Sequence, residues 1–175
     1  MMSNILTLLL SAVLSSFTLS NGNISVTIAP DGSLESLMNV KTGHDYASGG
    51  YLWRLYYDCP QEKEIQIVGA GQTPAISSEG NTVTITYDSL VCRGETLPVS
   101  LELQVVLEDD KVRFCSSMTN NMPGTVLREF QYPLLRGTRL PSDHKLYTSE
   151  AGGKLTDFNG AYLSVKTVLK PSEQV

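Results

Sequence analysis

Histidine and cysteine side chains, which carry much of the metal-binding and nucleophilic chemistry of proteins, are few and scattered in this 175-residue chain. His44 and His144 are the only imidazoles, and no His-x-His or His-x-x-x-His spacing brings two ligands together. The spacing of Cys59, Cys92 and Cys115 matches no zinc pattern. We therefore expect no metal site and no cofactor. Buried, inert thiols are favoured, although the sequence is also compatible with a Cys92–Cys115 disulfide.

Carboxylates could supply glycosidase chemistry if two of them lay at the right separation. Asp109-Asp110 has the composition of a turn, and Glu102 lies among polar residues on one side of an alternating segment. Asp58 directly follows two tyrosines, and aromatic neighbours are typical of sugar sites. No serine has a nucleophile-elbow context, and no glycine-rich phosphate loop is present. The sequence assigns no catalytic residue and leaves Asp58 as a candidate for carbohydrate contact.

Residues 51–58, YLWRLYYD, have the most unusual composition in the chain and contain its only tryptophan, Trp53. Aromatic rings stack on the C–H faces of pyranose sugars, so Trp53, Tyr57 and Asp58 are candidate carbohydrate-binding residues. Alternatively, Trp53, Leu55 and Tyr57 share one face of a strand and fill the hydrophobic core. The alternation of the segment favours the core interpretation.

A two-residue hydrophobic period runs through much of the chain and predicts the elements that position these candidates. Between Leu97 and Leu107, apolar residues alternate with polar ones, as in a strand with one buried face. Turn-forming pairs such as Asn21-Gly22, Asp31-Gly32 and Gly80-Asn81 separate the segments. The sequence therefore predicts an all-β, antiparallel β-sandwich. Its expected strands lie near residues 24–29, 51–57, 82–88, 97–107, 111–119 and 125–133.

The net charge and the amino-terminal segment indicate which partners and which cellular location to expect. A net charge of −5 with scattered basic residues argues against nucleic-acid binding. Residues 1–16 are interpreted as a signal-peptide-like segment that precedes one β-sandwich domain over residues 17–175. The apolar run Ile5–Leu14 is shorter than the ~20 residues of a membrane-spanning helix, so no stable membrane span is expected. The usual basic residues before the run are missing, and a hydrophobic first strand or an incomplete amino terminus is the alternative. A secreted or periplasmic protein is predicted.

Several short motifs occur in an order that resembles the amino-terminal β-supersandwich of large secreted bacterial glycoside hydrolases, a module similar in fold to galactose mutarotase. The resemblance covers roughly residues 17 to 157. It rests on the segments Phe17–Gly22, Asp31–Leu37, Lys41–His44, Trp53–Asp58 and Arg128–Pro133. These motifs are turns and strands rather than catalytic signatures, so no catalytic residue is carried over.

The resemblance implies a non-catalytic β-sandwich that packs against the catalytic (β/α) barrel of a parent glycoside hydrolase, with polysaccharide as a further partner. No barrel sequence follows Val175, so we expect an incomplete sandwich, a fragment that associates through exposed strand edges. A stand-alone carbohydrate-binding module and a structural surface or adhesion sandwich are the alternatives. An aldose epimerase ranks last, because neither histidine lies in a matching motif.

Overall fold

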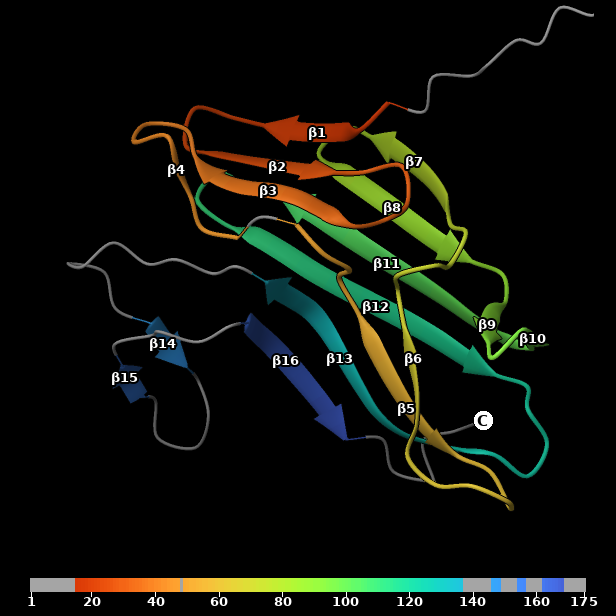
Figure 1. Cartoon of the computed structure of the whole chain (residues 1–175). Helices are drawn as coiled ribbons and strands as arrows, with labels where there is room; N and C mark the ends of the chain where they lie inside the picture. Colours follow the sequence, from red (N-terminus) through yellow and green to blue (C-terminus); the bar gives the residue numbers. More distant parts are fainter. Residues whose placement is uncertain (1–14, 48, 137–145, 149–153, 157–161, 169–175) are drawn as a thin grey trace, which may run out of the picture.

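The computed structural model describes residues 15–47, 49–136, 146–148, 154–156 and 162–168, and every regular element in them is a β-strand (Figure 1). In chain order these are β1 (Phe17–Ser20), β2 (Ile24–Ile28), β3 (Leu34–Asn39), β4 (His44–Asp45), β5 (Arg54–Asp58), β6 (Ile65–Val68), β7 (Ala75–Glu79), β8 (Thr82–Tyr87), β9 (Leu90–Cys92), β10 (Glu95–Leu97), β11 (Val99–Leu107), β12 (Val112–Asn120), β13 (Val126–Arg136), β14 (Leu146–Thr148), β15 (Lys154–Thr156) and β16 (Tyr162–Val168). The predicted all-β architecture is confirmed, and each predicted strand overlaps an observed one.

Most of the strands form two layers around one hydrophobic core, and β9-β10 and β14-β15 form two separate two-stranded sheets. One layer is the antiparallel sheet β12-β11-β8-β7. Two other antiparallel sheets, β1-β2-β3-β4 and β16-β13-β5-β6, lie on the opposite side of the core (Figure 1). The segment 50–52, which precedes β5, connects these two sheets. The Leu34 N–H of β3 donates a hydrogen bond to the Gly50 carbonyl, and the Leu134 N–H of β13 donates one to the Leu52 carbonyl. The second layer is therefore continuous in hydrogen bonding although its strands come from distant parts of the chain.

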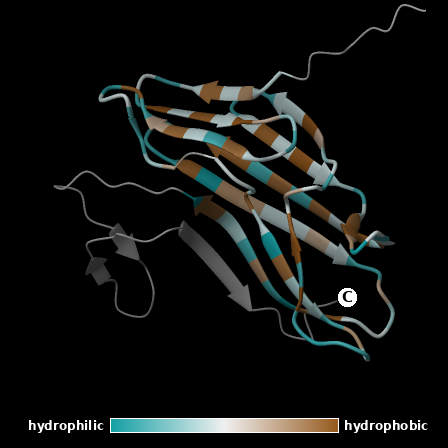
Figure 2. Ribbon diagram, viewed as in Figure 1, coloured by the Kyte–Doolittle hydropathy of each residue, from teal (hydrophilic) through white to brown (hydrophobic). Residues whose placement is uncertain are grey.

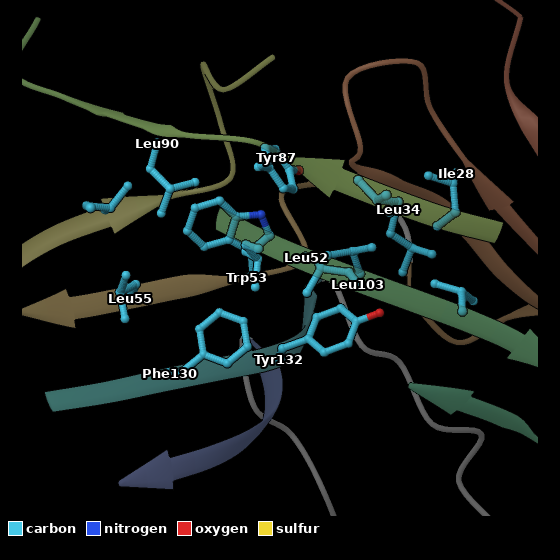
Figure 3. Close-up of a cluster of buried hydrophobic side chains, with 14 of the residues drawn as sticks. Ile28, Leu34, Leu52, Trp53, Leu55, Tyr87, Leu90, Leu103, Phe130 and Tyr132 are labelled. Carbon is cyan, nitrogen blue, oxygen red and sulfur yellow. The ribbon is translucent and has the colours of Figure 1, made fainter. Parts of the chain in front are cut away.

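Alternation along the strands produces the core, and Figure 2 shows it as hydrophobic and hydrophilic bands along β8 and β11. Val83, Ile85 and Tyr87 of β8 are buried, while the threonines between them face outward and are half-buried. In Figure 3 the side chains of both layers meet around Trp53. The Tyr132 hydroxyl also donates a hydrogen bond of 3.0 Å to the backbone carbonyl of Gln104 in the facing layer.

The turns between strands lie where the sequence predicted them. Gly32 and Gly80 have φ angles of 79° and 57°, which favour glycine. The turn between β1 and β2 works differently, because the Asn21 side-chain oxygen accepts hydrogen bonds from the backbone N–H groups of Asn23 and Ile24. The first described strand, β1, begins at Phe17, and residues 1–14, with most of the predicted signal-like segment, lie outside the described residues. The described residues contain no helix that is long and apolar enough to cross a membrane.

Candidate functional site

The segment around β5 sends its side chains alternately to two environments. Trp53, Leu55 and Tyr57 point into the core between the layers. Arg54 and Tyr56 lie on the opposite, outward face of the sheet and are half-buried. A period of two therefore divides the aromatic segment between the core and the surface.

Trp53 and Tyr57, two of the predicted carbohydrate-binding residues, belong to the core. The Trp53 side chain is 0% exposed and meets Tyr87 edge to face, with ring centroids 5.3 Å apart (Figure 3). Burial, followed by a hydrogen bond with Cys92, raises the pKa of Tyr57 to about 12. In this fold neither ring offers a face to a sugar at the surface. The core interpretation accounts for both residues.

On the outward face, a polar network joins β5 to the neighbouring strand β13. The Arg54 guanidinium donates hydrogen bonds of 3.0 and 2.5 Å to the side-chain oxygen of Gln131. The Gln131 side-chain nitrogen in turn donates to the Glu129 carboxylate. The Arg54 guanidinium also lies 5.3 Å from the centre of the Tyr56 ring. Gln131 is only 8% exposed, and Arg54, Tyr56 and Glu129 are half-buried, so the centre of the network is withdrawn from solvent although it lies on the outside of the sheet.

Asp58, the third predicted residue, anchors the other end of this face. Its carboxylate accepts a 2.8 Å hydrogen bond from the Glu64 backbone N–H and a 2.6 Å hydrogen bond from Arg128 Nε, and Lys63 lies 3.6 Å away. The Glu64 N–H, and then Arg128, hold the pKa of Asp58 below its usual range. Such a carboxylate stays ionised and saturated with donors, which suits a structural acceptor and not a general acid.

These groups surround an open cleft of about 660 Å³. It is lined by Tyr56, Asp58, Lys63, Glu64, Arg128, Glu129 and Gln131. Donors, acceptors and one aromatic ring stand side by side, a combination that suits a polyhydroxylated ligand. Sequence analysis placed Asp58 here but missed the other residues. The alternation within the segments Trp53–Asp58 and Arg128–Pro133 indicated which of their side chains face outward. Only the pairing of β5 with β13 shows that these side chains lie together.

The remaining chemically active side chains form no second site among the residues that can be described. The His44 ring meets the Tyr46 ring edge to face, with ring centroids 4.8 Å apart. His144 lies outside the described residues. Cys59, Cys92 and Cys115 are all unpaired and half-buried, so the Cys92–Cys115 disulfide is absent from this structure. No group of three metal-ligating side chains occurs in the described part of the chain.

Comparisons with known proteins place the fold. No protein-family model matches the chain, and no curated protein matches it significantly. Among solved structures, the chain is similar to 4-alpha-glucanotransferase from Thermococcus litoralis, with 13% sequence identity and a TM-score of 0.55 over 79% of this chain and 27% of that enzyme. It is also similar to a galactose mutarotase-like protein from Lactobacillus casei ATCC 334, with 16% identity and a TM-score of 0.50 over 87% of this chain and 68% of that protein.

The chain therefore has a galactose mutarotase-like β-sandwich fold. It spans about a quarter of the glucanotransferase and about two-thirds of the mutarotase-like protein. Identities this low establish the shared fold alone.

Proposed function

We propose that this chain is a non-catalytic β-sandwich module of an exported carbohydrate-active enzyme, a glycoside hydrolase, and that it packs against the catalytic (β/α) barrel of that parent protein. The observation that carries the proposal is the withdrawn polar network on the outward face of β5 and β13. Gln131 and Asp58 in this face are 8% and 5% exposed and are held by hydrogen bonds within the chain, so the face presents an ordered set of polar groups before any partner binds.

The non-catalytic part of the proposal rests on how the acids are held. Asp58 is ionised and bound by Glu64 and Arg128, and Glu129 accepts from Gln131. A glycosidase needs one carboxyl group kept protonated by a raised pKa. The Asp58 pKa is shifted in the opposite direction. Asp58 therefore does not fit the general-acid role, and the role proposed for this face is to bind and to orient.

The parent-enzyme part is supported by the fold comparison. The glucanotransferase shares this fold over only 27% of its length, so a β-sandwich of this kind occurs as one part of a larger carbohydrate-active enzyme. Fold analogy supplies no catalytic residue, and none is assigned.

The test begins with the coding sequence on either side of this chain, where the proposal expects a barrel in the same or the next reading frame. The chain and that barrel, produced separately, should associate in isothermal titration calorimetry. Arg128→Glu should weaken the association by breaking the pairing with Asp58. Arg113→Glu is the matched control, because Arg113 pairs with Glu108 on the opposite layer and the two arginine side chains are 55% and 52% exposed. Absence of association, or equal weakening by both variants, would refute the docking proposal.

A stand-alone carbohydrate-binding function is the second candidate, and the cleft beside Tyr56 favours it. In affinity electrophoresis on gels containing α-glucan, β-glucan or galactan, a binding module would be retarded by at least one polymer. Tyr56→Ala should abolish that retardation, whereas Tyr46→Ala, on the other side of the second layer, should not. Retardation of the isolated wild-type chain would promote this candidate over the docking module.

A further inference from the structure

Within the described part of the chain, the sandwich is open along strand β12, at a place separate from the polar cleft. On the inner face, Val105 of β11 pairs with Phe114 of β12, and Leu103 pairs with Ser116. Both β11 residues are 0% exposed, yet Phe114 is half-buried and Ser116 is exposed. Because paired residues point to the same face of a sheet, the facing layer covers β11 fully but the inner side of β12 only in part. Phe114 meets Tyr132 of the facing layer edge to face, with ring centroids 5.7 Å apart, whereas Ser116 is left exposed.

The backbone of β12 is open as well. Over its nine residues, Val112–Asn120, it pairs with β11 on one side, and no strand of the described chain pairs with its other side. Natural sheets protect such edges with proline, bulges, charged side chains or very short strands. The charged side chain of β12, Arg113, pairs with Glu108. β12 contains no proline, and its register with β11 runs without a bulge. The edge can therefore accept another strand.

An apolar groove of about 580 Å³ lies directly beside this edge. Val112 and Phe114 of β12 form one wall, and Leu37, Tyr46 and Leu135 belong to the opposite layer. A strand added to the edge of β12 would direct alternate side chains into the space between the two layers, where the groove lies.

The rim of the groove is acidic. None of its lining residues is basic, and Asp110 is exposed at its edge. The neighbouring cations Lys111 and Arg113 both pair with Glu108. Asp110 is therefore the charge that an incoming segment meets. A basic flank on that segment would complement it, whereas a second copy of this chain, with a net charge of −5, would not.

We propose that the free edge of β12 and the adjoining groove form a docking site for an extended polypeptide segment of a partner protein, with apolar side chains at alternate positions and a flanking lysine or arginine. Main-chain hydrogen bonds to β12 supply affinity, and apolar side chains in the groove supply specificity.

The experiment uses the full chain and a fluorescein-labelled, end-blocked nonapeptide in which valine and phenylalanine alternate with threonine between terminal lysines. Fluorescence anisotropy measures binding, and hydrogen–deuterium exchange locates it. We expect saturable binding with new protection of β12 amides. The same peptide with N-methyl groups on alternate amides should bind at least about tenfold more weakly, because it cannot complete the ladder of hydrogen bonds.

The acidic rim is tested with a matched pair of exposed aspartates. Asp110→Lys should weaken binding by about three- to tenfold at low salt, and Asp88→Lys, in the turn after β8, should not. Equal binding of the N-methylated peptide, protection of another strand, or no difference between the two variants would overturn the proposal. Protection, without peptide, of the β12 amides that are not hydrogen-bonded to β11 would overturn it too. That protection would assign the edge to a second copy of the chain if sedimentation shows a dimer. If sedimentation shows a monomer, it would assign the edge to another segment of the same chain.

Discussion

Arg54 donates two hydrogen bonds to the side-chain oxygen of Gln131, and this contact ties together two motifs that are 77 residues apart in the sequence. Arg54 belongs to the aromatic segment and Gln131 to the segment REFQYP. Both segments belong to the family resemblance found in the sequence. Their side chains contact each other only because β5 and β13 are neighbouring strands. The outward face of the second layer is organised around this contact.

Replacing Gln131 should destabilise the sheet. Gln131→Leu keeps the size of the side chain but removes the acceptor of both Arg54 hydrogen bonds and the donor to Glu129. A part-buried guanidinium that loses such an acceptor costs about 1–3 kcal/mol. Urea unfolding followed by tryptophan fluorescence measures the change. An unchanged unfolding midpoint would show that solvent replaces the network without cost.

The contribution of Asp58 to stability should depend on pH. Its pKa is lowered in the folded protein, first by the Glu64 N–H and then by Arg128. A carboxyl group of this kind stabilises the fold above its unfolded pKa, about 3.9 for aspartate, and loses that contribution as the pH falls through the lower folded value. The difference in free energy of unfolding between wild type and Asp58→Asn should be largest near pH 7. It should shrink below about pH 4. A difference that is constant from pH 7 to pH 3 would contradict this assignment.

Two glycines with the same backbone angle separate backbone strain from crowding. Gly32 and Gly71 both have φ of 79°. A Cβ atom at Gly32 would lie 2.7 Å from the Tyr87 hydroxyl, whereas one at Gly71 would meet nothing within 4 Å. Gly71→Ala should therefore cost about 1–2 kcal/mol from the backbone alone. Gly32→Ala should cost a further 1–3 kcal/mol, roughly, from overpacking. If thermal or urea unfolding shows equal decreases in the free energy of unfolding for Gly32→Ala and Gly71→Ala, Tyr87 moves aside without cost.

Trp53 should behave as a core residue. Trp53→Ala removes a fully buried side chain and should destabilise the protein by roughly 3–5 kcal/mol. Tyr56→Ala, three positions along on the outward face, should cost much less. Unfolding is followed by circular dichroism, since the variant lacks the tryptophan signal. A stable Trp53→Ala protein that has lost retention on polysaccharide gels would restore Trp53 as a sugar platform.

The isolated chain should neither hydrolyse aryl glycosides nor speed the anomer exchange of free hexoses. In the described residues, Asp58 and Glu129 of the cleft accept hydrogen bonds from Arg128 and Gln131, and His44 packs against Tyr46. Chromogenic substrates and polarimetry measure these two activities. A rate above background that disappears in His44→Ala would revive the epimerase interpretation.

The sequence by itself determined the strands and the side of each strand that is buried. Alternation is a local property of an extended backbone, so the turn glycine Gly32 and the burial of Val83, Ile85 and Tyr87 could be inferred without knowing which strands are neighbours. The same rule placed Trp53 in the core. Asp58 was found through its aromatic neighbours, but its partner Arg128 was not.

Only the tertiary structure decided which strands are neighbours and where the sandwich is left open. The pairing of β5 with β13 creates the cleft, and the groove lies beside the edge of β12 with which no described strand pairs. Pairing depends on how the whole chain closes around its core, and a two-residue period is equally consistent with many strand orders. The hydrophobic pattern of Val112, Phe114 and Met118 is that of a buried face. It gives no sign that the opposite layer covers this face only in part, because coverage is a relation between sheets and not a property of one strand.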